Sequence, residues 1–338
     1  MKRNIKNTIL LALKLLLLVC LFISIYVYTR EVLRDKSASE ALNIIIDQPD
    51  GTYDVIFAGS SHMQYAMQPA QLFGEYGISS CNASTAAQSV PTTYYVLKEL
   101  IRRHDPEMVV VDLFMVFYPE LYQSKARMHQ ALDNLPFSLN KIAAIEDLLE
   151  TEKEEFYINY LLYHGRWKSL EEFDYQFHEF VNEKYQYLAN TMPFENDFVP
   201  VPVDETEELP QGSGEYLKKI VDLCKETNTQ LLLTVVPWRA DVDNNGTPAL
   251  IQQRMYNMVE VCAEQWGVDY LNGLHCLNEM GFDFTTDMSE YSHVNLTGAR
   301  KITSYYGALL KENYLIPDRS QDPSYADWYE DYHEYLKL

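Results

Sequence analysis

Apolar and polar positions along most of this chain alternate in the pattern of buried strands followed by amphipathic helices. Short apolar runs bounded by turn-forming residues predict five strands, at residues 53–59, 78–84, 106–117, 229–237 and 268–273. Apolar residues at helical spacing predict four helices, at residues 90–104, 214–227, 249–267 and 295–314. The alternation predicts an α/β fold: a five-stranded parallel sheet, helices on both faces and right-handed crossovers. The sheet domain then spans residues 53–117 and 213–315.

Residues 118–212 interrupt this alternation between the third and fourth strands. The segments 141–167 and 169–190 have helical spacing, and 192–214 has the composition of a loop. An insertion after a central strand lies where ligands bind in open α/β sheets, so we expect a cap or a partner-binding subdomain. The acidic, aromatic tail 316–338 is expected to be either a docking helix or a poorly ordered end.

The N-terminal segment 1–30 has a basic start and then an apolar run from residue 8 to residue 28, interrupted by Thr8, Lys14 and Ser24. A membrane-spanning helix needs about 20 residues, and the Lys14 side chain can reach the interface. The slight excess of basic residues before the run favours a cytoplasmic N-terminus. We expect a single-pass signal anchor, a juxtamembrane segment at 31–52 and an extracytoplasmic domain; cleavage near "KSASEA" is the alternative.

Composition narrows the class of partner. The 338-residue chain is 47% apolar and 22% charged, which is normal for a globular protein. Its net charge of −22 argues against binding to nucleic acid and against adhesion to anionic lipid through overall charge. Its five cysteines show no C-x-x-C or zinc spacing, which favours isolated apolar side chains over a disulfide framework.

The stretch "AGSSH" at the end of the first predicted strand contains the candidate nucleophile, Ser61. Taken alone, Ser61 is better explained as a helix-capping serine, because a serine nucleophile needs a base. His293, in "TTDMSEYSHVNLTGARKI" before the last helix, is the one histidine in a suitable context. Glu290, three residues upstream, is favoured as the acid that orients it, with Asp287 as the alternative. A serine followed much later by an acid and a histidine is a known order for this chemistry on α/β sheets.

With these motifs in place, the chain resembles the SGNH, or GDSL-type, hydrolase superfamily. "GSSH" is similar to the first family block, with Ser60 in place of Asp; "CNASTAAQS" is similar to the second, with Ala87 at the glycine position; "SEYSHVN" is similar to the fifth, with Glu290 in place of Asp. In "DLFMVFYP", Val116 stands where the third block carries Asn. The resemblance implies a three-layer α/β/α, flavodoxin-like domain. It also implies a Ser61–His293–Glu290 triad, oxyanion donors at the backbone N–H groups of Ser61 and Ala87, and no metal or organic cofactor.

Where the chain departs from the family pattern, it resembles one branch of the superfamily, the membrane-anchored SGNH-like acyltransferases. These act with membrane-bound O-acyltransferases in D-alanylation of teichoic acids and O-acetylation of exopolysaccharides. The resemblance implies acyl transfer from a donor ester, through an acyl-serine, to a glycan or polyol hydroxyl. The alternatives are an envelope esterase or lipase with the same triad and a non-catalytic scaffold that retains the fold.

The remaining candidates for contact with substrate share a place in these motifs or in the insertion: His62, Asn82, Gln88, His164, Arg166, Trp167 and Asn295. For His62 the alternative is packing at the start of a helix. In "YHGRWKSL", a guanidinium beside an indole suits a sugar, phosphate or carboxylate. The alternative there is a surface arginine packed on an aromatic ring.

Overall fold

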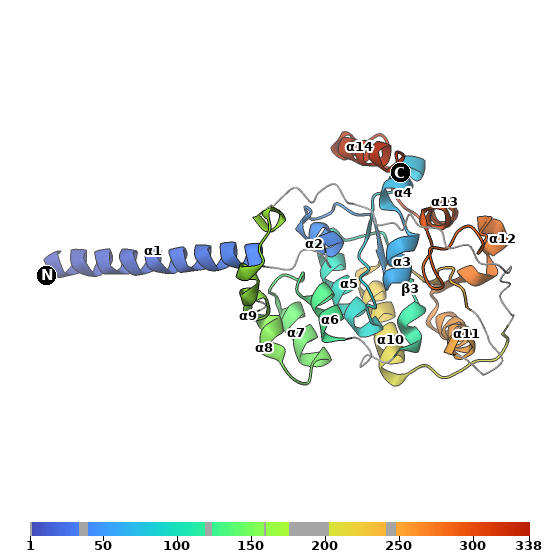
Figure 1. Cartoon of the computed structure of the whole chain (residues 1–338), viewed down its shortest axis with the longest axis horizontal. Coiled ribbons are helices and arrows are strands. Elements are labelled where there is room, and N and C mark those ends of the chain that lie inside the picture. The colour runs from blue at the N-terminus through green and yellow to red at the C-terminus, as the bar shows by residue number, and fades with distance from the viewer. Residues whose placement is uncertain (1, 34–39, 119–123, 159, 176–202, 241–247) are drawn as a thin grey trace.

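The structure, a computed structural model, describes residues 2–33, 40–118, 124–158, 160–175, 203–240 and 248–338. The first helix, α1 (Lys2–Leu33), extends from the rest of the chain as an isolated rod (Figure 1). Within it, Lys6–Leu33 forms a helix long and apolar enough to span a membrane, and its large apolar side chains from Ile9 to Tyr28 are exposed. The sequence prediction of one N-terminal apolar helix is therefore confirmed.

The core is a five-stranded sheet in which every neighbouring pair is parallel. Its strands are β1 (Val55–Ala58), β2 (Ser80–Asn82), β3 (Met108–Asp112), β4 (Gln230–Val235) and β5 (Asp269–Asn272). Their order is β2-β1-β3-β4-β5, which is the flavodoxin-like order. The five predicted strands and the parallel sheet are confirmed. Because the strand order reverses between β1 and β3, ligands are expected at the carboxyl ends of these two strands.

The predicted helices also form, within three residues of the expected bounds. They are α5 (Val90–His104), α10 (Gln211–Thr227), α11 (Pro248–Trp266) and α13 (Leu296–Asn313). Helices α3 (Ser61–Ala66) and α4 (Pro69–Tyr76) follow β1, and α2 (Glu40–Asp47) precedes it. Helix α5 packs against α10, and α4 packs against α13. These two separate helix pairs are consistent with a three-layer α/β/α fold.

The third strand is shorter than its apolar run. The sequence predicted a strand from 106 to 117, but β3 ends at Asp112, and Phe114–Phe117 forms a 3₁₀ helix, η1. The Asp112 carboxylate accepts a hydrogen bond from the Phe114 N–H at 3.2 Å. A side chain that binds a backbone donor two residues ahead favours a turn, so the chain leaves the sheet there.

The insertion contains short helices instead of two long ones. The expected helix at 141–167 is divided among α7 (Leu139–Leu148), α8 (Lys153–Tyr157), α9 (Tyr160–Tyr163) and the 3₁₀ helix η3 (His164–Lys168), after α6 (Lys125–Leu132). One break falls at Glu152, which has a left-handed backbone with φ +58°. Of the second expected helix, only η4 (Glu172–Tyr175) lies in the described ranges. The expected loop is irregular from 203 to 210, and 211–214 begins α10.

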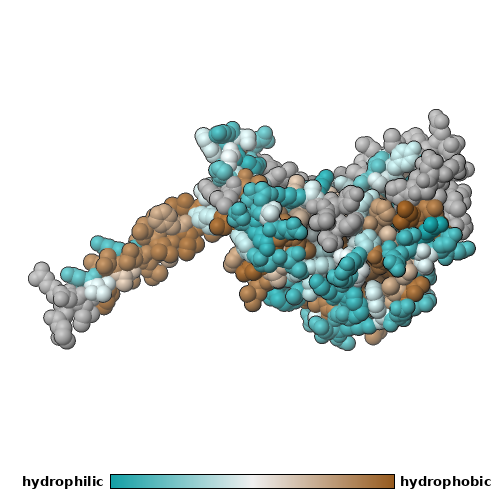
Figure 2. Space-filling view, turned by 90° about the horizontal axis from the view of Figure 1, so that it is seen from below, coloured by the Kyte–Doolittle hydropathy of each residue, from teal (hydrophilic) through white to brown (hydrophobic). Residues whose placement is uncertain are grey.

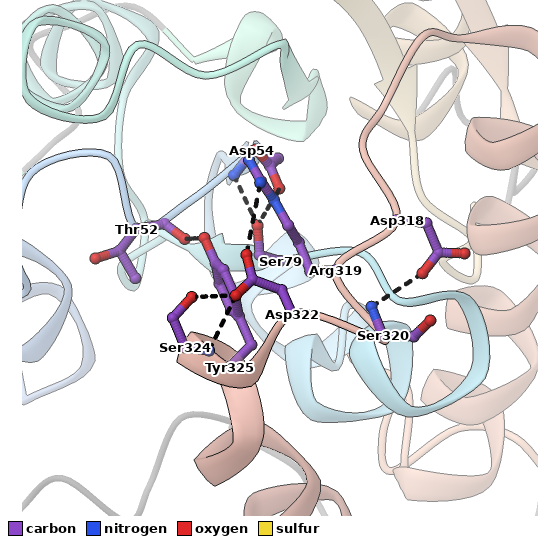
Figure 3. Close-up of polar contacts among 9 residues, drawn as sticks. All are labelled: Thr52, Asp54, Ser79, Asp318, Arg319, Ser320, Asp322, Ser324 and Tyr325. Atoms are coloured by element: carbon purple, nitrogen blue, oxygen red, sulfur yellow. Dashed lines mark hydrogen bonds and ion pairs between the residues drawn. The ribbon is translucent and has the colours of Figure 1, made fainter.

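The tail docks as a helix, one of the two expected outcomes. After the 3₁₀ helix η7 (Pro323–Tyr325), α14 (Ala326–Tyr335) packs on α4. Figure 3 shows Arg319 reaching Asp54, just before β1, with its Nε and Nη2 atoms 2.8 and 2.7 Å from the two carboxylate oxygens. The Tyr325 hydroxyl donates to the Thr52 carbonyl at 3.1 Å. These contacts close the tail over the amino end of β1.

Candidate active site

Ser61 lies at the turn from β1 into α3. Its neighbour Ser60 is the N-cap, and the Ser60 hydroxyl accepts the His62 N–H at 3.4 Å. Ser60 therefore performs the capping role, which leaves the Ser61 hydroxyl for another partner. At Gly59, φ is +157°, and a Cβ atom there would lie 2.8 Å from the Cβ of Asp112. The turn needs glycine at this position because β1 and β3 approach closely here.

Ser61, His293 and Glu290 are brought together in the arrangement of a serine triad. The Ser61 Oγ lies 2.7 Å from Nε2 of His293, and Nδ1 of His293 is hydrogen-bonded to Glu290 Oε1. With Nδ1–H donating to the carboxylate, Nε2 is the acceptor for the Ser61 hydroxyl. The hydrogen-bond network therefore assigns the tautomer that a general base requires.

Glu290 is kept ionised by its surroundings. Partial burial by itself raises the pKa of Glu290, but hydrogen bonds from Ser292 and the neighbouring His293 outweigh it, so the net pKa is lowered. The Ser292 hydroxyl donates to Glu290 Oε1 at 2.8 Å, and the Ser292 N–H donates to Oε2 at 3.2 Å. Ser292, which orients this carboxylate, was not among the residues predicted from sequence.

Asp287, the alternative acid, has a different environment. Its side chain is fully buried, and its Oδ2 atom accepts from Lys301 Nζ and from the Asp283 N–H, both at 2.7 Å. These contacts fix the start of the loop that carries His293. Of the two candidate acids, Glu290 contacts the imidazole, whereas Asp287 stabilises the conformation of the loop.

The His293 loop is held at both ends. Met288 and Val294 form an antiparallel bridge, and the Ser289 N–H donates to the His293 carbonyl at 2.8 Å. Asn295 is the N-cap of α13, and its amide donates to the Thr286 carbonyl at 2.8 Å. The buried Asn295 side chain thus binds the chain itself, so its described contacts are structural and none of them supports the expected contact with substrate.

Two further candidates also have structural contacts. The Asn82 amide donates to the carbonyls of Met63 and Met67, at 2.8 and 3.1 Å, and so secures α3 to β2. The buried Gln88 side chain bonds the hydroxyls of Thr85 and Thr93, at 3.0 and 3.1 Å. The Asn82 contacts therefore position α3, and the Gln88 contacts shape the loop between β2 and α5.

Ala87, in that same loop, has φ +51°. This left-handed conformation favours glycine and is uncommon for an alanine. A glycine would adopt this backbone conformation without the strain that an alanine has here. Val116, in contrast, is fully buried within η1 and offers no side-chain donor.

His62 lies beside the triad, within a group of aromatic rings. Its ring stacks on Phe114 at 3.3 Å between centroids and lies 5.1 Å from the His293 ring. Trp238, after β4, meets Phe114 edge-on at 5.3 Å, and Tyr65 lies 5.2 Å from His293. Burial, and then the charge of His293, lower the pKa of His62 well below its usual value, so this imidazole stays neutral.

Asp112, which was not among the residues predicted from sequence, packs against the turn between β1 and α3. Burial raises the pKa of Asp112 to about 7, against the opposing effect of backbone hydrogen bonds from Val236, Phe114 and Leu113. A carboxylate directly after the β-branched run "MVVV" was the available signal, because parallel strands end at the same edge of the sheet. Trp238 directly follows the fourth predicted strand, so the same rule places it at this edge of the sheet.

The candidates from the insertion, His164, Arg166 and Trp167, lie away from the triad. Arg166 donates from Nη1 to the Leu33 carbonyl at the end of α1 and from Nη2 to Asp174, at 2.9 and 2.8 Å. His164 and Trp167, on the same 3₁₀ helix, are exposed. The structure thus separates this cluster from Ser61 and places it against α1.

Neither the comparison with protein-family models nor that with curated proteins gave a match. The function of the chain is therefore inferred from the geometry of the site.

All five cysteines are described, and none of them forms a disulfide. Across the described residues, no group of three or more His, Cys, Asp or Glu is arranged to hold a metal ion.

Proposed function

We propose that this chain is a membrane-anchored serine acyltransferase of the SGNH type, which transfers an acyl group to a hydroxyl of a cell-envelope polysaccharide or similar polymer. The observation that carries the proposal is the 2.7 Å contact between Ser61 Oγ and His293 Nε2, with Glu290 on the other ring nitrogen. A serine that served only as a helix cap would not need an oriented imidazole.

The reaction has two half-steps. In the first, His293 Nε2 takes the Ser61 proton while Oγ attacks the acyl carbonyl of a donor ester, and the donor alcohol leaves with that proton. In the second, an acceptor hydroxyl loses its proton to His293 and attacks the acyl-serine, and Ser61 regains its proton. Glu290 stabilises the imidazolium that forms in each half-step.

The oxyanion needs donors, and Val116 supplies none in place of the family's Asn. The backbone N–H groups of Ser61 and Ala87 are two donors, and we assign the third to His62. The Nδ1 atom of His62 is buried and has no hydrogen-bond partner among the described residues. An orphaned buried N–H is rarer than an orphaned acceptor, so the proton belongs on Nε2, which then is a donor. Its ring stacks on Phe114, in the loop after β3 that carries the Asn in the resembled family.

Two observations favour transfer over hydrolysis. Tyr65 and Phe114, the partly buried aromatic side chains beside the triad, can offer ring surface to a sugar acceptor. Helix α1 can hold the domain at a membrane, where a membrane-bound O-acyltransferase would supply the acyl donor. In this proposal the N-terminus is cytoplasmic and the main domain is extracytoplasmic.

The test is the intact mass of the full chain in detergent after incubation with 4-nitrophenyl acetate, beside Ser61→Ala and His293→Ala. We expect one acetyl adduct that requires Ser61 and is released slowly by water but faster by added oligosaccharide. Fast release to water alone would show an esterase. No adduct on the wild type would overturn the catalytic proposal and favour the scaffold.

A further inference from the structure

The face of the domain that surrounds the end of α1 lies close to any membrane that this helix spans. The exposed apolar run of α1 ends at Tyr28, and burial in the domain begins at Val32, which is 4% exposed. Four residues of helix rise about 6 Å. The headgroup layer on each side of a bilayer is about 5–8 Å thick. Because α1 is unbroken to Leu33, the domain begins inside that layer.

Three elements of the insertion flank this end of the helix. Residues of α9, η3 and η4 contact α1, and Figure 1 shows α9 beside its domain-proximal end. Arg166 joins the Leu33 carbonyl to Asp174, so that η3 and η4 are fixed to the last turn of α1. The position of these elements relative to the helix is therefore set by direct hydrogen bonds.

The exposed side chains of these elements are of the kinds found at membrane surfaces. Trp167 is 64% exposed, Tyr175 50% and Leu162 40%, and the Lys168 amine lies 5.6 Å from the Trp167 ring. Tryptophan and tyrosine are enriched at the headgroup level, and lysine reaches phosphate while its stem stays in apolar surroundings. Figure 2 shows the hydrophobic surface of α1 running up to the domain.

We propose that Leu162, Trp167, Lys168 and Tyr175, called here the anchor-side face, insert into the lipid headgroup layer and hold the domain against the membrane. The neighbouring Glu171 and Glu172 are exposed, so the contact depends on the aromatic side chains rather than on net positive charge. The proposal gives Trp167 a lipid contact in place of the sugar, phosphate or carboxylate that its sequence context suggested. It rests on α1 spanning a membrane and is independent of the chemistry at Ser61.

The experiment uses tryptophan emission of the full chain in nanodiscs of phosphatidylcholine and phosphatidylglycerol. Lipids with a nitroxide either on the headgroup or deep in the acyl chain are the quenchers. Trp167→Phe is the test variant, and Trp266→Phe, at the end of α11, is its matched control. We expect the headgroup nitroxide to quench Trp266→Phe at least as strongly as the wild type, because one emitter remote from the lipid is lost, and to quench Trp167→Phe at least twofold less. The deep nitroxide should quench all three weakly.

Equal quenching of the wild type and Trp167→Phe by the headgroup nitroxide would overturn the proposal. So would ready quenching of Trp167 by acrylamide in the nanodisc, because a residue among headgroups is shielded from water. Shielding from acrylamide without quenching by the headgroup nitroxide would show that protein covers Trp167 and would also contradict a lipid contact. Far-ultraviolet circular dichroism of each variant shows whether the fold is retained.

Discussion

The Nε2 atom of His293 lies 2.7 Å from the Ser61 hydroxyl oxygen, although 232 positions of sequence separate the two residues. The contact forms because β1 delivers Ser61 to the carboxyl edge of the sheet, and α13, which follows the His293 loop, packs against α3. The pair therefore forms only in the assembled domain. The role of each neighbouring residue can be tested by its effect on the reaction of Ser61.

Glu290→Gln should lower the rate of Ser61 acetylation by about 10³–10⁴-fold, because a neutral amide no longer fixes the imidazole tautomer. Its melting temperature should change little, since the Glu290 side chain is 41% exposed. Stopped-flow release of 4-nitrophenol measures the rate. Asp287→Asn is the control: loss of its buried partnership with Lys301 should cost about 1–3 kcal/mol of stability. If Asp287→Asn, fully folded, loses acetylation while Glu290→Gln keeps it, the assignment of the acid is wrong.

His62→Phe should lower the acetylation rate by roughly 10²-fold or more, with little change in KM, because an oxyanion donor acts mainly in the transition state. Phenylalanine keeps the stacking on Phe114, so a role in packing alone would leave the rate near that of the wild type. His62→Gln retains a side-chain N–H and should recover part of the rate. Pre-steady-state kinetics of all three proteins, with the pH profile, distinguish the two roles.

Asp112→Asn should alter how stability depends on pH. Because burial raises the pKa of Asp112 to about 7, the folded protein binds more protons than the unfolded chain between about pH 4 and pH 7. This group therefore makes the wild type less stable as pH rises through that window, and its effect is constant above it. The stability of the wild type relative to Asp112→Asn should fall by up to about 4 kcal/mol from pH 4 to pH 8. Denaturant titrations at each pH measure this difference, and a constant value would contradict the assignment.

Arg319→Ala should loosen the tail. It leaves the Asp54 carboxylate, whose side chain is 8% exposed, without its bidentate partner. The arginine itself is 31% exposed, so we expect a loss of about 2–3 kcal/mol, less than for a fully buried pair. Limited proteolysis should then remove α14 more quickly. Lys337→Ala, which breaks an exposed pair with Glu334, is the control and should shift stability by less than about 0.5 kcal/mol. Equal behaviour of the two variants would show that Arg319 does not secure the tail.

Local pattern was sufficient for the strands and for the long helices of the sheet domain. The five strands, the helices at 90–104, 214–227, 249–267 and 295–314, and the apolar N-terminal helix all form near their predicted positions. Periodicity fails where side chains act on the backbone or where a helix has no continuous partner. Asp112 ends β3 through its bond to Phe114, and the expected helix at 141–167 breaks at Glu152. Neither event changes the hydrophobic pattern, so the sequence signal could not report it.

The sequence by itself determined where the five strands and four long helices of the sheet domain lie, and it singled out Ser61 and His293 as candidate nucleophile and base, because these follow from local patterns and short motifs. Tertiary structure alone decided the strand order, the separation of Glu290 from Asp287, and the burial of Asp112 beneath the nucleophile turn. It also moved Arg166 and Trp167 from an expected substrate site to the end of α1. The physical reason is that contact between distant residues depends on how the layers pack, and the local pattern of a single chain carries no information about distance in space.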